Sequence, residues 1–183
     1  MHPQAATDMR DRDYNDSIVF LSQFFQFTES EVELRAIANE GGMVGRVFTR
    51  NPDDVQAFLA RRDVLGVAVY FGPCTRIRGP HQGRREDLAE SIAAWVDIDC
   101  YKLGIPVSDV VAVLRGCPFP PTGVIGSGGG VHAYWLWREP IPLPEPEPRL
   151  DAVLQQLAGV FCGDPLPAQL AAVMRLQAMS ASS

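Results

Sequence analysis

Two stretches of the sequence, Trp95-Val-Asp-Ile-Asp-Cys100 and Ile125-Gly-Ser-Gly-Gly-Gly-Val-His-Ala-Tyr-Trp135, determine which fold and site to expect. The apolar run into the first stretch predicts a central strand that ends in two carboxylates, Asp97 and Asp99. Alternate residues of a strand point to the same face, so both carboxylates can reach one cation. Two such carboxylates repel each other unless a cation lies between them, and Mg²⁺ and Mn²⁺ suit oxygen ligands. The pair therefore predicts a metal site, although a polar strand end with an Asx-type turn has the same pattern.

The second stretch predicts an anion-binding bend between two strands. Ser127 is followed by Gly128, Gly129 and Gly130, whose backbone N–H groups can approach a phosphate closely because no side chain intervenes. His132, at the start of the next strand, can donate a hydrogen bond to the same phosphate group. The bend is not a Walker loop, since no Lys-Ser/Thr follows the glycines. A flexible hairpin turn with a buried histidine remains the structural alternative.

A third carboxylate would complete a metal-binding triad. Asp164 follows Phe161-Cys-Gly and precedes Pro165, so we expect it at a constrained turn rather than on a solvated helix face. Asp151 is a rival, but its place on an expected helix beside Arg149 is typical of surface charge. Asp164 could instead be an ordinary helix cap.

Positive charge is concentrated in one expected loop, residues 72–86, which contains Arg76, Arg78, Arg84 and Arg85. These arginines could grip the phosphates of a nucleic acid or a nucleotide, and a solvated charged loop is the alternative. The chain as a whole carries a formal charge of −6, with a sequence pI of about 5.0. That balance argues against tight stand-alone DNA binding, because phosphate contacts usually require a basic face. The negative net charge is still compatible with a local basic groove on the molecule.

Composition narrows the class of protein further. The four cysteines are scattered without a Cys-x-x-Cys pair, so we do not expect a structural zinc site. No run of eighteen apolar residues is present, so we expect no membrane span. Residues 1–16 form a polar tail without the basic start and apolar stretch of a secretory signal, and we therefore expect a cytoplasmic protein.

The alternation of strand and helix patterns predicts an α+β or mixed α/β domain with no internal repeat. Strands are expected at 32–37, 44–49, 65–71, 93–99, 124–127 and 131–137. Helices are expected at 18–27, 51–62, 108–115, 150–161 and 167–176, with Asn51 and Ser108 as caps.

The order of these motifs resembles the archaeo-eukaryotic primase superfamily. The similarity is to its primase–polymerase (PrimPol) and RepB-like replication-protein primase branches on phages, plasmids and other mobile elements. It rests on Trp-Val-Asp97-Ile-Asp99, on Ser127-Gly-Gly-Gly-Val-His132-Ala-Tyr-Trp and on Gly163-Asp164, with Val69-Tyr-Phe-Gly72 and Arg76 upstream. The resemblance implies a catalytic core over residues 17–176, with an RRM-like mixed β-sheet flanked by helices.

The resemblance also implies roles for individual residues in a template-dependent nucleotidyl transfer. Asp97, Asp99 and Asp164 would hold two Mg²⁺ or Mn²⁺ ions. The nucleoside triphosphate would be bound by His132, Arg76 and the loop Ser127, Gly128, Gly129 and Gly130. The single-stranded DNA template would be bound by Arg78, Arg84, Arg85 and Arg175. No helicase segment is present, so we expect any unwinding to come from a separate helicase.

Two positions depart from the family pattern. Many relatives have serine two residues before the histidine, where this chain has Gly130. Relatives also continue after an Arg-Leu with a Pro-Gly-Thr-x-Asn-like stretch, which residues 177–183 do not match, and this predicts an atypical or truncated tail. Two other functions fit the same residues. One is a nucleotide- or nucleic-acid-binding protein without catalysis, and the other is a glycosyltransferase that binds a nucleotide sugar through Asp-x-Asp and Mn²⁺.

Overall fold

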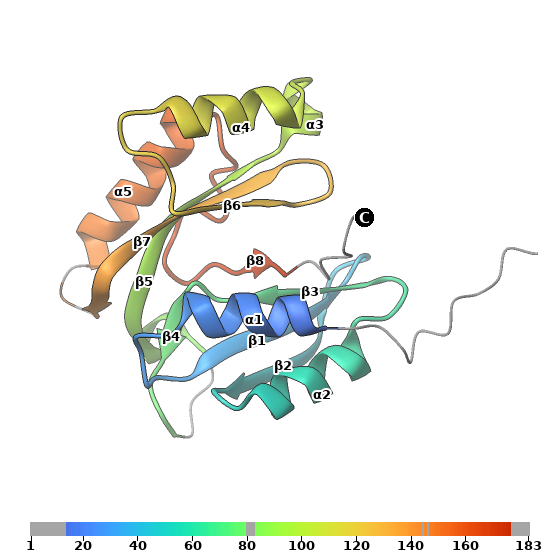
Figure 1. The fold of residues 1–183 in the computed structure, drawn as a ribbon. Coiled ribbons are helices and arrows are strands. Elements are labelled where there is room, and N and C mark those ends of the chain that lie inside the picture. Colours follow the sequence, from blue (N-terminus) through green and yellow to red (C-terminus); the bar gives the residue numbers. More distant parts are fainter. Residues whose placement is uncertain (1–13, 80–82, 144, 146, 177–183) are drawn as a thin grey trace, which may run out of the picture.

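The computed structural model describes residues 14–79, 83–143, 145 and 147–176, and these residues form two antiparallel sheets (Figure 1). The order in the first sheet is β2 (Met43–Thr49), β1 (Val32–Ala38), β3 (Val67–Phe71) and β8 (Met174–Arg175). The order in the second sheet is β4 (Cys74–Arg76), β5 (Leu88–Ile98), β7 (Val131–Pro142) and β6 (Gly123–Gly126). The helices are α1 (Asn15–Phe24), α2 (Pro52–Arg62), α3 (Cys100–Leu103), α4 (Val107–Gly116) and α5 (Glu147–Val160), with a 3₁₀ turn η2 (Arg85–Asp87).

The α+β class is confirmed, and so are most of the expected elements. The expected mixed sheet is replaced by two sheets whose described strand pairs are all antiparallel. Asn51 caps α2 as expected, with its side chain accepting from the Asp53 N–H at 3.0 Å. Ser108 does not cap α4, because the helix already begins at Val107 and Pro106 occupies the cap position. The expected tails, 1–16 and 177–183, lie outside the described residues except for 14–16.

The expected helix over 167–176 is wrong. Two prolines, Pro165 and Pro167, open this segment, and it runs as turns until Met174–Arg175 pairs with β3. The Leu176 N–H then donates to the Val69 carbonyl at 2.8 Å. The segment therefore connects α5, which packs on the second sheet, to the edge of the first sheet.

Helix α1 joins the two sheets through aromatic side chains. The ring of Phe24 lies 5.4 Å from that of Phe71 on β3 and 5.2 Å from that of Tyr134 on β7, both edge to face. Phe20 contacts the same two rings, at 5.4 Å and 6.3 Å. Edge-to-face pairs add to the free energy of burial. This cluster fixes the position of β3 relative to β7.

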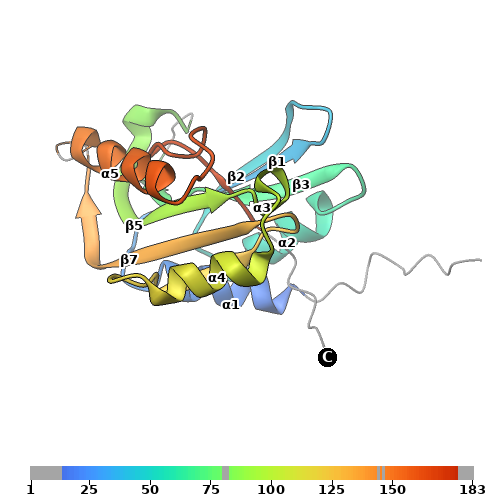
Figure 2. The same ribbon diagram turned by 90° about the horizontal axis from the view of Figure 1, so that it is seen from above.

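Alternation along β5 and β7 assigns the two faces of the second sheet. Helices α4 and α5 lie on its upper side in Figure 1, with Leu114 and Leu154 fully buried, and Figure 2 shows both helices from above. Tyr134 and its β5 partner Trp95 point to the opposite face, toward α1. Asp97 and His132 are two residues from Trp95 and Tyr134 along their strands, so they share that lower face.

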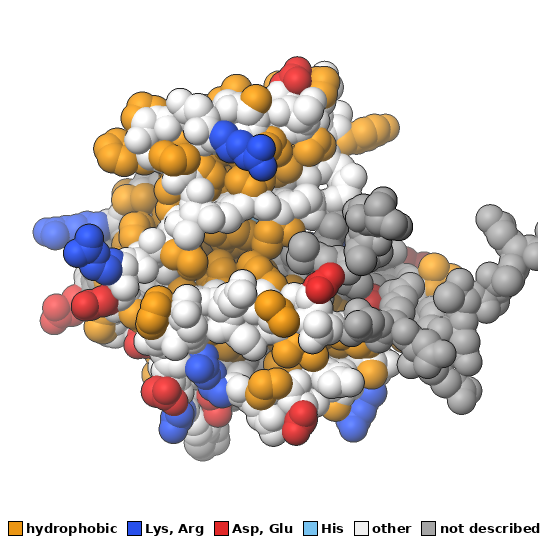
Figure 3. Space-filling model, in the orientation of Figure 1, with side chains coloured by type: hydrophobic (Ala, Val, Ile, Leu, Met, Phe, Trp, Pro, Cys, Tyr) orange, Lys and Arg blue, Asp and Glu red, His pale blue; other side chains and the backbone are white. Residues whose placement is uncertain are grey.

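Apolar side chains also remain visible on the surface between α1 and the β6–β7 hairpin (Figure 3). A pocket of roughly 430 Å³ lies there, lined by Phe20, Phe24, Val124 and Leu136 among others. No helix in the described part of the chain has the length and apolar character of a membrane span.

Candidate active site

Asp97 and His132 are neighbours because their strands are in register. Asp97 on β5 pairs with His132 on β7, and residues directly opposite in a sheet project to the same face. The His132 Nε2 lies 3.5 Å from the Asp97 Oδ1. The imidazole is buried, whereas the Asp97 side chain keeps 31% of its surface exposed. The pair thus stands at the boundary between the core and an open pocket.

Asp164 reaches this pair through a close backbone approach after α5. Its N–H donates to the Asp97 carbonyl at 2.7 Å, on the edge of β5 that β4 leaves uncovered at this end. Gly163 permits the approach, because a Cβ there would lie 2.3 Å from the Val96 Cγ2 and 2.9 Å from the Asp97 carbonyl oxygen. Cys162 just before it has a positive φ of 53°. A tight turn therefore positions the third carboxylate.

The glycine loop lies against the end of β5 and cannot be replaced by larger residues at its last position. A Cβ on Gly130 would lie 2.0 Å from the Ile98 carbonyl oxygen and 3.1 Å from the Asp99 Cα. Serine or any larger residue at this position would require the loop or the end of β5 to shift. Ser127 donates its N–H to the Gly130 carbonyl at 2.8 Å, and the Gly129 carbonyl accepts from Tyr101. The loop is therefore tied to α3.

These groups surround one open pocket of roughly 230 Å³ between the two sheets. Most of its lining was expected from the sequence: Asp97, Asp99, Ser127, Gly129, Gly130, His132 and Asp164. Tyr70, Val173 and Arg175 line it from the first sheet and the segment before β8. Val173 was missed because no local motif marks it, and Tyr70, although it lies in the Val69–Gly72 stretch, was assigned no role.

The charged form of Asp97 is disfavoured by its surroundings in the pocket. Burial raises the pKa of its carboxyl to about 6, and the neighbouring carboxylates of Asp164 and Asp99 add to the increase. Lys102 acts in the opposite direction without offsetting it. A cation placed among these carboxylates would relieve this repulsion.

Asp99 has a second task, because it caps α3. Its Oδ1 accepts from the Lys102 N–H at 3.0 Å, and its Oδ2 pairs with the Lys102 Nζ at 3.0 Å. These hydrogen bonds lower the pKa of Asp99. The turn-forming role considered from the sequence is therefore present, and Asp99 also faces the pocket.

His132 is held neutral at physiological pH. Burial lowers its pKa to about 4, and the positive charge of Arg175 lowers it further. The contact with Asp97 would favour the charged form, but burial and Arg175 outweigh it at that N–O distance. Tyr134 lies 3.4 Å from the His132 Nδ1 through its hydroxyl, whose pKa is raised well above 10 by burial. The protonated hydroxyl can donate to Nδ1, which leaves the proton on Nε2, facing the pocket.

The donor chemistry of the pocket fits a divalent cation, although the carboxylates are not gathered into a coordination shell. Within residues 14–79, 83–143, 145 and 147–176, no three His, Cys, Asp or Glu side chains converge as metal ligands. Three carboxylates nonetheless line one pocket, and their mutual repulsion is felt by Asp97. Oxygen donors of this kind suit Mg²⁺ or Mn²⁺.

Arg76 is not available to a ligand, contrary to the expectation from the sequence. Its guanidinium is fully buried on β4, where its Nε donates to Glu33 at 2.8 Å. It pairs opposite Leu88, nine residues before Asp97 on β5, which is roughly 30 Å away along the strand. Arg76 therefore stabilises the junction of β1 and β4 instead of contacting a nucleotide in the pocket.

The structure separates the four arginines that were expected to bind template. Arg78 is exposed and donates to the Glu29 carbonyl at 2.9 Å, and Arg84 is exposed beside η2. Arg85 pairs with Glu147 at 2.8 Å and also with Asp151, so it fastens η2 to α5. Of the four, only Arg175 lines the pocket.

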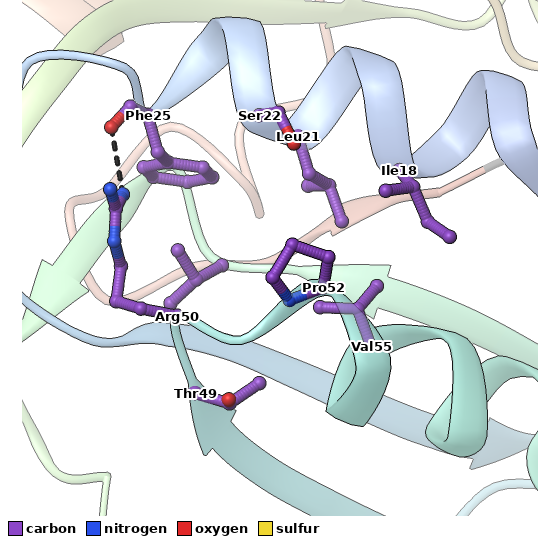
Figure 4. Close-up of a pocket in the computed structure, with 9 residues that line it drawn as sticks. Ile18, Leu21, Ser22, Phe25, Thr49, Arg50, Pro52 and Val55 are labelled. Atoms are coloured by element: carbon purple, nitrogen blue, oxygen red, sulfur yellow. Dashed lines mark hydrogen bonds between the residues drawn. The ribbon is translucent and has the colours of Figure 1, made fainter.

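A different pocket, of roughly 200 Å³, lies between α1 and α2 (Figure 4). Ile18, Leu21, Phe25 and Val55 line it, and Arg50 donates to the Phe25 carbonyl at its rim. Its lining contains no carboxylate or histidine, so it offers neither a metal ligand nor a general base. The pocket at the ends of β5 and β7 is therefore the candidate active site.

Comparison with solved structures identifies the fold. The chain superposes on the AEP domain of a cyanophage S-2L primase-polymerase with a TM-score of 0.62 and 18% identity, covering 88% of this chain and 80% of that one. The catalytic domain of primase RepB′, solved in complex with initiator DNA, gives 0.58 and 18%, covering 92% and 77%. A primase RepB′ structure gives 0.54 and 17%, covering 88% of this chain and half of that one.

Searches by sequence alone find no matching family model and no matching curated protein. The resemblance noted in the sequence is thus confirmed at the level of fold. The chain has the architecture of primase–polymerase catalytic domains.

Proposed function

We propose that this protein is a template-dependent DNA primase–polymerase, a nucleotidyltransferase that uses divalent metal ions. The observation that carries the proposal is the pocket itself. Asp97 and Asp99 at the end of β5, His132 on β7 and Asp164 after α5 come from three separate points of the chain and meet in one pocket. They do so in a fold that the chain shares with primase–polymerase domains.

Asp97, Asp99 and Asp164 would hold two Mg²⁺ or Mn²⁺ ions, and these ions would supply charge neutralisation at the phosphates and activation of the attacking hydroxyl. Asp99 could take part once its ion pair with Lys102, 3.0 Å long in this structure, has opened. In the reaction, a 3′-hydroxyl oxygen attacks the α-phosphorus of a nucleoside triphosphate. The hydroxyl proton is lost to solvent, a new P–O bond forms, the P–O bond that links the α- to the β-phosphate breaks, and pyrophosphate leaves.

The remaining groups would bind and orient the triphosphate. His132 offers a neutral Nε2–H donor, which can contact a phosphate oxygen without itself changing protonation. Gly129 and Gly130 line the pocket, where their backbone N–H groups could bind phosphate oxygens, and Arg175 supplies a fixed positive charge beside His132. Arg76 is not part of this assignment. The partners we propose are nucleoside triphosphates, a single-stranded DNA template and a separate helicase, in replication of a phage, plasmid or other mobile element.

Incorporation of nucleotides on a defined template tests the proposal. The purified protein is incubated with single-stranded DNA, labelled ribo- or deoxynucleoside triphosphates and Mn²⁺ or Mg²⁺, and the products are resolved by length. We expect products complementary to the template, formed with metal and lost with EDTA. Absence of product under every metal and nucleotide combination would refute catalysis. Products that ignore the template sequence would refute template dependence.

Nucleotide binding without turnover is the second candidate. It is favoured by the engagement of Asp99 with Lys102 and by the open arrangement of the carboxylates. Calorimetric binding of a nucleoside triphosphate that is never incorporated would support it. Any template-directed product would exclude it.

A further inference from the structure

One row of side chains crosses the first sheet and ends in the candidate active site. Strand register places Arg35 directly opposite Arg46 on one side and Tyr70 on the other. Tyr70 in turn lies directly opposite Arg175. Directly paired residues share a face, so Arg46, Arg35, Tyr70 and Arg175 form one row, which we call the arginine row. Tyr70 and Arg175 line the pocket that holds Asp97.

The arginine row lies on the face of the sheet that α2 does not cover. Gly45 and its partner Ala36 belong to the opposite face, and a Cβ on Gly45 would lie 2.7 Å from the Arg62 side chain of α2. Ala36 is fully buried there. Arg35 and Arg46, by contrast, keep 19% and 24% of their side chains exposed.

The row is held rigid by a buried carboxylate and keeps an excess of positive charge. The Glu33 side chain is fully buried and pairs with Arg35 at 2.5 Å, with Arg46 at 3.1 Å and with Arg76. The pKa of Glu33 is lowered, because its hydrogen bonds and charge pairs with the arginines outweigh burial, so it is ionised. Arg35, Arg46 and the buried Arg76 then carry three positive charges against the one negative charge of Glu33, and Arg35 and Arg46 are the two that remain partly exposed. Guanidinium groups fixed in this way are preorganised for phosphate oxygens.

One aromatic ring, that of Tyr70, lies within the row, and a second, that of Phe48, lies beside its far end, where a Cβ on Gly83 would come within 2.8 Å of the Phe48 ring. Tyr70 stands between Arg35 and Arg175, and Arg46 lies 5.7 Å from the centre of the Phe48 ring. Positive charge along a track with interleaved aromatic rings is the pattern that binds single-stranded nucleic acid, because phosphates pair with the cations and bases stack on the rings. A lone triphosphate would not require a track of this length, since three cross-strand steps of about 5 Å span roughly 15 Å.

We propose that the arginine row binds the backbone of single-stranded DNA and leads it into the active site. The proposal rests on the proposed function for its choice of ligand and locates the strand on the molecule. Template binding, which the sequence alone assigned to Arg78, Arg84 and Arg85, is then a role of Arg35, Arg46 and Tyr70. Arg175, at the junction of row and pocket, contacts the strand where it meets the nucleotide.

Fluorescence anisotropy with a labelled single-stranded oligonucleotide, in EDTA and without nucleotide, tests the row apart from catalysis. We expect Arg35→Gln and Arg46→Gln each to weaken binding roughly fivefold to tenfold. Each should also flatten the dependence of log K on log salt by about 0.7, the value for one lost phosphate contact to a single strand. Tyr70→Ala should weaken binding about tenfold through lost stacking, and Tyr70→Phe should retain it. Arg61→Gln, an exposed charge removal on α2, is the matched control and should bind like the wild type.

Two results would overturn the proposal that the arginine row binds single-stranded DNA. One is unchanged DNA affinity and salt slope in Arg35→Gln and Arg46→Gln. The other is loss of nucleoside triphosphate binding in Arg46→Gln with strand binding intact, which would make the far end of the row a nucleotide site. If only the proposed function fails, the result is different: DNA binding still depends on the arginine row, but the wild-type protein incorporates no nucleotide.

Wild-type protein provides a measurement that does not depend on the folding of any variant. Photo-crosslinking to oligonucleotides containing 5-bromodeoxyuridine, followed by peptide mapping, locates the strand directly. We expect crosslinks in β1, β2 or β3. Crosslinks confined to α2, α4 or α5 would overturn the proposal.

Discussion

At the scale of single residues, Asp97 links stability to function most directly. Its partial burial beside two other carboxylates costs free energy in the metal-free protein, and the same arrangement prepares it to bind a cation. We therefore expect Asp97 to lower the stability of the metal-free protein and to contribute to catalysis.

Asp97→Asn should therefore stabilise the metal-free protein at neutral pH. The folded-state pKa of about 6 lies above the ordinary 3.8, so the charged form is disfavoured in the folded state. The penalty is absent below pH 4, appears as pH rises through this window, and is complete above pH 6. The shift corresponds to about 3 kcal/mol, and partial exposure reduces the expected gain to about 1–2 kcal/mol.

Urea unfolding in EDTA, at pH 4 and pH 7.5, measures this gain. The difference between Asp97→Asn and wild type should be present at pH 7.5 and vanish at pH 4. At pH 7.5 His132 is neutral, so the difference measured there reports Asp97. A variant that is less stable than wild type at pH 7.5 would contradict the account of Asp97.

His132 gives a second prediction at this scale. Its folded-state pKa of about 4 lies below the ordinary 6.5, so neutral imidazole is favoured and stability falls as pH drops from 6.5 toward 4. Histidine ring resonances in NMR, assigned by comparison with His132→Gln, should titrate with a midpoint near 4 and show the proton on Nε2. A midpoint above 6 would mean that His132 is charged when it meets a nucleotide.

At the scale of elements, two glycines set the distance between segments that build the pocket. Gly130 brings the loop onto the end of β5, and Gly163 brings Asp164 against Asp97. Neither requirement can be read from a turn motif, because the obstructing atoms belong to another strand. Local pattern therefore predicted a glycine bend and a constrained turn, and only the fold explains which glycines cannot change.

Gly163→Ala should destabilise the protein by about 1–3 kcal/mol through overpacking and displace Asp164 from Asp97. Gly159→Ala, four residues earlier on α5, is the control, since no atom lies within 4 Å of a Cβ there. It should be neutral or stabilise by up to about 1 kcal/mol, because alanine favours helix. Denaturation together with nucleotide incorporation checks both variants. Equal stability and activity in the two would show that the close approach at Gly163 is not required.

Elements also show where sequence reasoning succeeds and where it fails. The strands that carry Asp97 and His132 were predictable because their apolar runs and turn residues are local signals. The short strands β4 and β8 were not, since Cys74–Arg76 and Met174–Arg175 become strands only by pairing with distant partners. The ligand-binding role expected for Arg76 and Arg85 in the loop 72–86 failed for a related reason. Arg76 forms an ion pair with Glu33, and Arg85 forms ion pairs with Glu147 and Asp151, which are all far away in sequence.

At the scale of the whole molecule, the pocket exists only because two sheets are held at a fixed separation. Asp97 and His132 come from one sheet and Tyr70 and Arg175 from the other, and α1 packs its aromatic rings against both. The arrangement of the sheets is thus the part of the account least visible in the sequence.

Phe24→Ala should therefore reduce stability by about 3–5 kcal/mol and impair nucleotide incorporation. Phe27→Ala, beyond the end of α1 with a side chain that is 70% exposed, should change neither by a measurable amount. Thermal unfolding and the incorporation assay check the pair. If Phe24→Ala kept wild-type stability, the aromatic junction would not be what holds the sheets together.

Incorporation of a labelled nucleotide onto a primed single-stranded template, compared across matched carboxylate variants, tests the central claim most directly. With Mn²⁺ present, wild type and Asp109→Asn, an exposed carboxylate change on α4, should extend the primer at equal rates. Asp97→Asn and Asp164→Asn should remain folded and lose extension by at least about a hundredfold, because each removes a charge that metal-assisted phosphoryl transfer needs. Extension by Asp97→Asn at the wild-type rate would contradict the claim that this pocket is a nucleotidyltransferase active site.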